Sequence, residues 1–282
     1  MKNKVYEMVT NRIIEQLENG ITANNWECPF SGLITGAYKK KKKKPYSLLN
    51  QMLLKNDGEY ATLKQWNSQG GKIRKGEKGE LVVFWKIYEV ETVSEDGTKG
   101  IENIPLLRYY YVFHISQVEG VKPLDIKPRE FQPIEEAERI LTNYIEKEQI
   151  TLEFSKSSEA YYSPNRDLIH LPLREQFKSE SQYYATAYHE AIHSSGHIKR
   201  LNRLNTSEIA SFGSASYSKE EMCAELGSAM ILNRLGIETP KTFKNSTAYI
   251  HSWIQVLKND PRFIVSASTK AEKAVKYIFN EA

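Results

Sequence analysis

Apolar positions in the first half of the chain alternate between helical and extended spacing. They recur at helical spacing close to the N-terminus and again in residues 45–54, which predicts an amphipathic helix followed by a short one. Residues 80–88 and 108–115 are rich in aromatic and β-branched side chains, and the polar stretch between them contains Asp96 and Gly97. Such runs on either side of a turn sequence predict two strands joined in a β-excursion.

The second half begins after a proline-rich stretch. Residues 123–133 include three prolines and lack periodicity, which predicts a linker between domains at residues 1–122 and 134–282. The pattern that follows alternates short extended runs with longer helical ones, so the whole chain is predicted to be an α+β protein. Helices are expected at residues 134–148, 182–193, 218–232, 246–258 and 268–279, and strands at 151–154 and 167–172.

The helix at residues 182–193 ends in the motif H-E-x-x-H. Positions i and i+4 share a helix face, so His189 and His193 are expected to present two imidazole nitrogens to one metal ion. Glu190 lies about 100° round the helix from His189, where it reaches a water held on that ion. One Zn²⁺ ion is the first choice, because two imidazoles and a carboxylate leave a position for water; Mn²⁺ and Co²⁺ are the alternatives. The other interpretation is a pair of surface histidines, which the uncharged neighbouring residues disfavour.

A third ligand has to come from another part of the chain. Gly196 fits the longer motif H-E-x-x-H-x-x-G-x-x-H, but Lys199 stands where that motif needs its last histidine. The helix at residues 218–232 offers Glu221 and Glu225, which lie one turn apart on one face. We assign Glu221 as the metal ligand and Glu225 as the group that orients a ligating histidine.

Two alternatives to this assignment stay open. Glu220 precedes Glu221 directly and offers the same carboxylate to the metal. Ser218 and Glu221 also match a capping box, in which Glu221 would only close the start of the helix and Glu225 would face solvent.

The net charge of +4 is concentrated in the first half. Residues 1–125 carry 19 basic and 15 acidic side chains, which accounts for the whole surplus. Six consecutive lysines, residues 39–44, are too dense in charge to pack, and phosphate is a common partner for such a block. The alternative is a solvated loop that keeps the protein soluble.

Aromatic residues accompany this basic surplus. Lysines and an arginine are interleaved with glycines in residues 70–79, and Trp26, Tyr46 and Trp66 lie in or near loops where bases could stack on them. Phe84 and residues 112–115 are assigned to the core of the sheet. The expected contacts to single-stranded DNA are Lys39, Lys40, Lys41, Lys42, Lys43, Lys44, Tyr46, Asn50, Trp66, Lys72, Arg74, Lys75 and Lys78.

These motifs, taken in order, resemble a known family. The first half resembles the single-stranded-DNA-binding domain of the ArdC antirestriction family and is similar to the N-terminal part of TraC-type plasmid primases. The second half resembles the zincin-like metallopeptidase domain of the same family, and the resemblance covers nearly the whole chain. The matching positions are Trp26, residues 46–50, 61–62, Gln65, residues 71–78, 189–197, 200–203, 220–221, 224–227 and 249–250, Trp253 and residues 271–277.

The resemblance implies a fold and an activity. It implies a DNA-binding domain followed by a zincin-like metallopeptidase domain, with an edge strand bordering the cleft above the metal helix; residues 167–171 are the candidate strand. In such a site the metal activates water, and Glu190 passes the water's proton to the leaving amine of an unknown protein substrate. Antirestriction in a mobile genetic element is the expected biological role. A DNA-coating protein with a structural metal site and a metal-dependent nuclease are the alternatives.

The apolar runs, the N-terminal residues and the cysteines predict a cytoplasmic protein. The chain has no apolar run of the ~20 residues that a membrane span needs. Its first residues are expected to lead into an amphipathic helix carrying acids, and not to form a signal peptide. Cys28 and Cys223 are far apart, as expected for two reduced, buried thiols in the cytoplasm.

Overall fold

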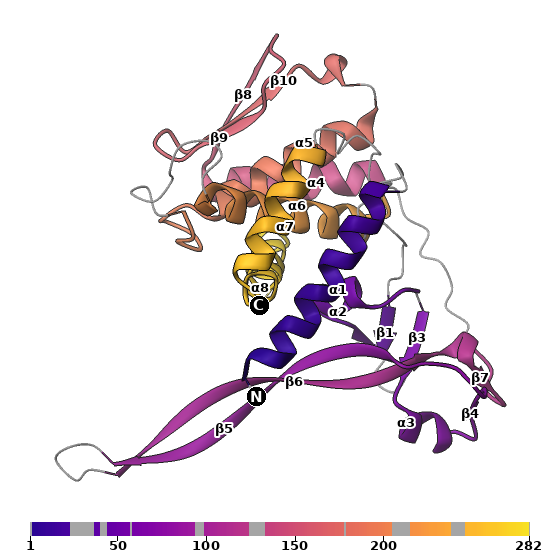
Figure 1. The fold of residues 1–282 in the computed structure, drawn as a ribbon. Helices are drawn as coiled ribbons and strands as arrows, with labels where there is room; N and C mark the ends of the chain where they lie inside the picture. The colour runs from indigo at the N-terminus through magenta and orange to yellow at the C-terminus, as the bar shows by residue number, and fades with distance from the viewer. Residues whose placement is uncertain are drawn as a thin grey trace.

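The computed structural model describes residues 2–22, 37–39, 44–56, 58–93, 99–123, 133–177, 179–204, 215–237 and 246–281. A body of helices lies beside a long two-stranded ribbon, which confirms the α+β prediction (Figure 1). The helices are α1 (Lys2–Thr22), α2 (Leu48–Leu53), α3 (Leu63–Asn67), α4 (Pro133–Glu148), α5 (Glu180–Ser195), α6 (Ala215–Arg234), α7 (Ser246–Asn259) and α8 (Phe263–Ile278). None of the described helices is long and apolar enough to cross a membrane.

The first sheet has five strands in the order β2-β1-β3-β6-β5. Its strands are β1 (Ala37–Lys39), β2 (Lys44–Pro45), β3 (Gly58–Ala61), β5 (Glu80–Val93) and β6 (Lys99–His114). β5 and β6 pair antiparallel from Glu80 opposite Val112 to Val93 opposite Lys99, which forms the ribbon. The two predicted strands are therefore confirmed and longer than expected, and the expected turn at Asp96 and Gly97 falls outside the described residues.

The open edge of β5 is closed by one side chain. Asn50 on α2 donates its amide to the carbonyl of Val83 at 2.8 Å and accepts from the N–H of Val83 at 2.7 Å. These are the two bonds that a neighbouring strand would make, and all the groups involved are buried. The side chain therefore ends the sheet here and fixes α2 beside it.

The second sheet has the order β8-β10-β9, from β8 (Thr151–Ser155), β9 (Tyr161–Ser163) and β10 (Leu168–Pro172). β10 pairs parallel with β8 and antiparallel with β9, so it is the central strand. The expectation that residues 167–171 form the edge strand is therefore wrong. The edge facing away from β8 is β9, a strand of three residues that the sequence pattern did not predict. Short strands of a third, two-stranded sheet, β4 (Lys72–Ile73) and β7 (Val118–Glu119), lie beside α3, and two 3₁₀ turns, Ile115–Gln117 and Arg174–Gln176, complete the described elements.

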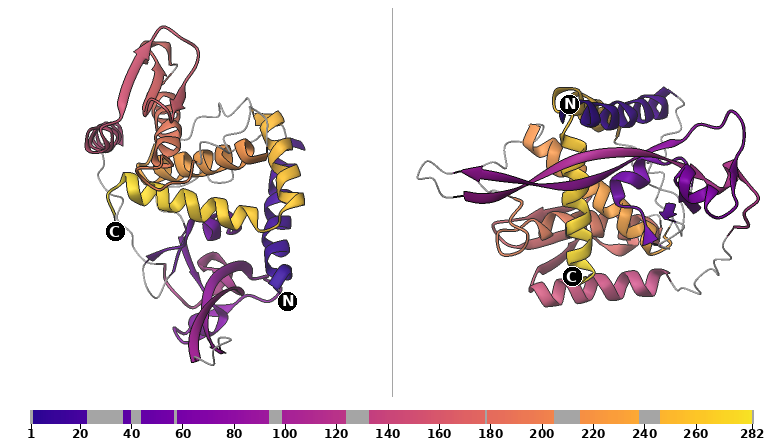
Figure 2. Two further views of the ribbon diagram at one scale, coloured as in Figure 1. Left: turned by 90° about the vertical axis from the view of Figure 1, so that its left-hand side faces the viewer. Right: turned by 90° about the horizontal axis from the view of Figure 1, so that it is seen from below.

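One hydrophobic core joins the two halves of the sequence. Buried residues of α1, α2, β5 and β6 form a single cluster with those of α4 to α8. α1 runs beside α7 (Figure 2, left), and Thr10 on α1 donates its hydroxyl to the carbonyl of Pro261 at 2.7 Å. α4 begins at Pro133, where the predicted linker ends, while residues 124–132 of that linker lie outside the described part of the chain.

Replacing Asn50 with Ala should lower the free energy of unfolding by about 2 kcal/mol or more, because a buried donor and a buried acceptor of Val83 lose their partner. Chemical denaturation measures this change. Asn67→Ala, at an exposed position on α3, is the control and should change the free energy of unfolding little. Equal stability of the two variants would show that Asn50 does not close the sheet.

Candidate metal centre

α5 supplies the two histidines from a well-anchored helix. Its N-cap Ser179 accepts a hydrogen bond from the N–H of Gln182, which satisfies one of the free donors at the start of the helix. The uncharged neighbours of the motif are buried, as the metal-helix interpretation predicted. His189 and His193 share one face, with their Nε2 atoms 3.1 Å apart.

α6 brings carboxylates to the same place. A Cβ at Gly227 would come within 2.6 Å of Ile192 Cδ1, so the glycine permits a close approach of α6 to α5. Ser228 beside it donates to the carbonyl of Ala185 at 2.9 Å. α6 begins at Ala215, so Ser218 lies inside the helix and the capping-box interpretation is wrong.

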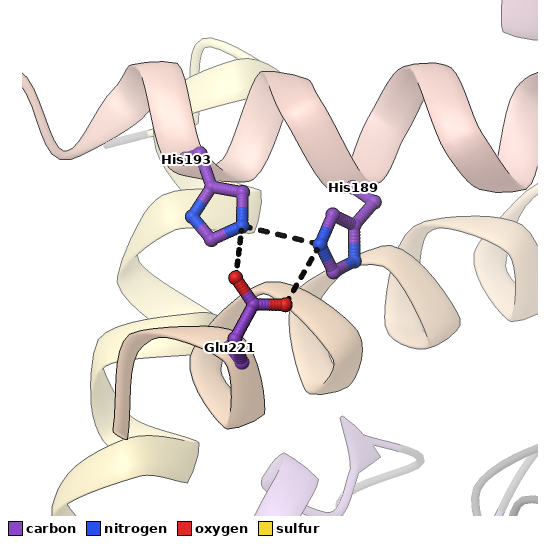
Figure 3. A group of neighbouring side chains, drawn as sticks. All are labelled: His189, His193 and Glu221. Atoms are coloured by element: carbon purple, nitrogen blue, oxygen red, sulfur yellow. Dashed lines mark hydrogen bonds and ion pairs between the residues drawn. The ribbon is translucent and has the colours of Figure 1, made fainter. Parts of the chain in front are cut away.

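Glu221 points between the two imidazole rings (Figure 3). Its Oε1 lies 3.3 Å from His193 Nε2, and its Oε2 lies 3.5 Å from His189 Nε2. Donors about 2.0–2.2 Å from one ion at tetrahedral angles would be about 3.3–3.6 Å apart. One donor atom from each of the three side chains lies within 4.8 Å of the other two, so these residues fit a divalent cation.

Charges in this cluster perturb one another strongly. Burial by itself raises the pKa of Glu221, but hydrogen bonds to both histidines outweigh burial and lower the pKa well below its usual value. Burial by itself lowers the pKa of His193, but Glu220 and Glu221 raise it to about 10. Without a cation, a proton on the imidazoles therefore compensates the carboxylates.

The outer nitrogens of the histidines face two further carboxylates. Glu225 Oε1 lies 3.7 Å from His189 Nδ1, the position expected of a group that orients this histidine. Glu220 Oε1 lies 3.3 Å from His193 Nδ1. Glu220 is thus on the far side of the ring from Glu221, and Glu221 is the one of the two that groups with both histidines as a possible metal site.

Glu220 is itself held by Arg203. The guanidinium Nε and Nη2 of Arg203 donate to the carboxylate at 2.9 and 2.8 Å, and Nη2 also donates to the carbonyl of Ile192 at 2.6 Å. Arg203 thereby satisfies a carbonyl near the end of α5, where positive charge is favourable. Sequence reasoning missed these roles of Arg203 and Glu220; the adjacent pair of glutamates was the available signal.

Glu190 follows His189 directly on α5. Its side chain is buried, and its charge acts on both His189 and His193.

Three of the residues predicted to contact DNA lie in the interior instead. Tyr46 is 5% exposed, Asn50 is 6% exposed and the Trp66 side chain is fully buried. The indole of Trp66 donates to the carbonyl of Phe113 at 2.9 Å, and Asn50 closes the edge of β5. These side chains stabilise the fold, so the expectation that they bind DNA is corrected.

The predicted basic residues whose side chains the structure describes are exposed or partly exposed. Lys72, Lys75 and Lys78 are exposed, and the exposed Arg74 forms an ion pair with Glu77 at 2.9 Å. Lys39 pairs with Lys44 across the β1–β2 hairpin, whereas Lys40, Lys41, Lys42 and Lys43 fall outside the described residues, as does Trp26.

The ribbon exposes aromatic side chains that the sequence pattern assigned to the core or did not single out. Val112 is buried as expected, but Phe84 is 42% exposed, so its assignment to the core is wrong. Trp85, Tyr109 and Tyr111 on the same two strands are also exposed.

Two family models match the chain. One, described as a zincin-like metallopeptidase, matches residues 135–270 and includes the histidines and glutamates above. The other, described as the N-terminal domain of anti-restriction factor ArdC, matches residues 3–113.

Several relatives match over nearly the whole chain. A DNA primase TraC of Escherichia coli is 32% identical over an alignment of 300 positions, which covers 99% of this chain but only 27% of the primase. A second TraC primase of the same species is 33% identical, over 20% of its length. The uncharacterized protein y4eC of Sinorhizobium fredii is 32% identical over 97% of this chain and 91% of its own length.

Two solved structures also match over nearly the whole chain. The Mn(II)-bound crystal structure of the antirestriction ArdC protein from the R388 plasmid has a TM-score of 0.74 and 29% identity, covering 98% of this chain and 97% of that one. The metal-free structure of the same protein gives a TM-score of 0.74 and 30% identity, with 98% of each chain covered. With both halves matched in order and 98% of the chain covered by the ArdC structure at 30% identity, the chain belongs to the ArdC antirestriction family.

Proposed function

We propose that this protein binds single-stranded DNA through its N-terminal half and hydrolyses peptide bonds at a divalent metal centre in its C-terminal half, as part of antirestriction. The observation that carries the hydrolase is the placement of Glu221 between the Nε2 atoms of His189 and His193, at separations typical of donors to one small cation. The family membership supports the antirestriction role.

The donor set favours Zn²⁺ or a similar ion. Two imidazoles and one carboxylate are a ligand set of catalytic zinc sites, and the Mn(II)-bound relative supports Mn²⁺ as an alternative. An ion held there would polarise a carbonyl and lower the pKa of water.

The protein's own groups complete the chemistry. Glu190, buried and adjacent to His189 on α5, is the proposed base that takes a proton from water and returns it to a leaving amine; its burial and its charge effect on His189 support this role. Glu225 and Glu220 face the outer nitrogens of His189 and His193 and hold each Nε2 toward Glu221.

A peptide substrate is supported by the neighbouring sheet. β9 packs against α5 and is the outermost strand of its sheet, so its outer edge can pair with an extended chain. Arg200 holds the turn after β9 to the end of α5, because it binds Asp167 and donates to the carbonyl of Ser194 at 2.7 Å. The edge strand and the metal helix therefore keep a fixed relation.

Zn²⁺ or Mn²⁺ should raise the melting temperature of the wild-type protein, and Glu221→Gln should remove most of this effect. At about 100 times its Kd, an ion that binds only the folded state adds about 2.7 kcal/mol of stability. Thermal melts with metal and with chelator measure the difference, and Glu175→Gln, at an exposed position, is the matched control. A full metal response in Glu221→Gln would exclude Glu221 as a ligand.

Glu190→Gln should keep the metal and lose peptide hydrolysis by about 10²–10⁴-fold, because the substituted amide cannot accept a proton. Metal analysis tests whether the variant keeps the metal. Cleavage of a mixed peptide library, followed by mass spectrometry, tests whether it loses hydrolysis. The same variant should also lose protection of incoming DNA. Full protection by Glu190→Gln would instead favour a protein that acts by coating the strand.

Glu225→Gln should weaken metal binding by about 10- to 100-fold without destabilising the metal-free protein. Burial raises the pKa of Glu225 to about 7, so its charge is unfavourable in the metal-free fold and its removal costs no stability. Competition with a chelating dye measures affinity, and chelator-treated melts measure stability. Unchanged affinity would show that Glu225 does not orient His189.

A further inference from the structure

One broad side of the β5–β6 ribbon combines rings with cations. Residues directly opposite in an antiparallel pair share a face, and Phe84 is opposite Arg108 while Val82 is opposite Tyr110. The same face carries Lys86 and Tyr88, because alternate residues of a strand point the same way. We call this surface the aromatic–cationic face and define it by Phe84, Lys86, Tyr88, Arg108 and Tyr110.

Its rings are close together and accessible. The centroids of Phe84 and Tyr110 lie 5.5 Å apart, and Lys86 Nζ lies 4.7 Å from the centroid of Tyr88. Phe84 is exposed, and Tyr88 and Tyr110 are partly exposed. Seen from below, the ribbon crosses in front of the helices, so one of its sides faces away from the body of the molecule (Figure 2, right).

Its cations are not neutralised by the described part of the protein. Lys86 and Arg108 are exposed, and neither forms an ion pair with a described carboxylate. The positions opposite Lys86 and Tyr88 are Leu106 and Ile104, which are uncharged. Glu80, at the inner end of the ribbon, is already engaged with the backbone N–H of Lys55 at 2.7 Å.

The face continues toward the basic hairpin. Tyr110 is hydrogen-bonded to the side chain of Tyr46, and Lys39 Nζ lies 5.3 Å from the centroid of the Tyr46 ring. Lys39 opens the lysine block, so positive charge lies at this end as well as along the ribbon.

The opposite side of the ribbon lacks this combination. It carries exposed Trp85, Tyr109 and Tyr111, but across the described side chains from Leu81 to Glu89 and their partners it has no lysine or arginine. Its Val83 and Leu107 are packed in the core that the ribbon shares with the helices. Bases could stack there, but phosphates would find no counter-charge.

We propose that single-stranded DNA lies along the aromatic–cationic face, with bases stacked on Phe84, Tyr88 and Tyr110 and phosphates paired with Lys86, Arg108 and Lys39. The inference rests on the proposed DNA binding and assigns it a location. Rings that alternate with cations match a strand that offers π-faces and a regular series of negative charges.

Binding of a labelled oligothymidylate, measured by fluorescence anisotropy over a range of salt concentrations, tests the location. Phe84→Ala and Tyr88→Ala should each weaken binding at least about fivefold, because stacking on one base is lost. Phe84→Trp keeps a ring and should bind about as well as the wild type. Lys86→Ser and Arg108→Ser should each reduce the slope of log affinity against log salt by about 0.7.

The controls lie on the opposite side of the ribbon and on a distant helix. Tyr109→Ala and Tyr111→Ala, which remove exposed rings from the opposite side of the ribbon on β6, and Lys273→Ser on α8 should bind like the wild type. Circular dichroism melts establish that each variant is folded. The proposed location alone would be overturned if the wild type binds, the opposite-side variants weaken this binding and the variants of the aromatic–cationic face do not. Absence of binding by the wild type would overturn the proposed DNA binding itself.

Discussion

The carboxylate of Glu221, held between the Nε2 atoms of two histidines, sets the constraint on which the C-terminal half depends. Four buried or partly buried glutamates surround these imidazoles, and Arg203 is the cation that neutralises one of them, Glu220. So much negative charge away from water is costly unless a positive charge compensates it. Without a metal, protons do so: Glu220 and Glu221 raise the pKa of His193 to about 10, and burial raises the pKa of Glu225 to about 7. A divalent cation would replace these protons, and this exchange couples metal binding to proton release.

The packing of α5 against α6 creates this cluster. Gly227 allows the two helices to approach, and Ser228 fixes their register through the carbonyl of Ala185. After α5 the chain turns back so that Arg200 and Arg203 bind carbonyls at the end of the helix. The same two arginines hold Asp167, in the turn between β9 and β10, and Glu220 of α6. Arg203 therefore positions Glu220 beside His193 while it binds a carbonyl near the end of α5.

The spacing of residues in the sequence predicted correctly which side chains share a face of one helix. His189 and His193 share a face because they are one turn apart, and Glu221 and Glu225 do so for the same reason, so both pairs were visible in the sequence. Ser218 was placed wrongly, since a helix of suitable sequence can begin a turn earlier than its first capping signal. The remaining errors concern contacts between distant residues.

The predictions of which side chains are buried and of which strand lies at the edge of the second sheet were wrong for this reason. Tyr46 and Trp66 were predicted to lie in or near loops, yet their rings are buried. Phe84 was predicted to be in the core, yet it is exposed on a ribbon that extends past the helices. Strand β10 looked like an edge because β9 is only three residues long and pairs with it on the far side. The N-terminal residues that carry the family resemblance likewise have structural roles here: Asn50 closes β5, and Thr62 with Gln65 forms the capping box of α3.

The shared core also relates the two proposed activities to each other. Separate domains joined by a linker move independently unless a large apolar interface holds them together. Here α1 packs on α7 and α2 on α8, and buried residues of these helices belong to one cluster with those of α5 and α6. The ribbon is attached to the same cluster through Val83 and Leu107. A DNA strand bound on the ribbon would therefore be held at a fixed orientation to the metal centre. A substrate that contacts both the ribbon and the metal centre must then span the distance between them, because no hinge between α1 and α7 can bring them together.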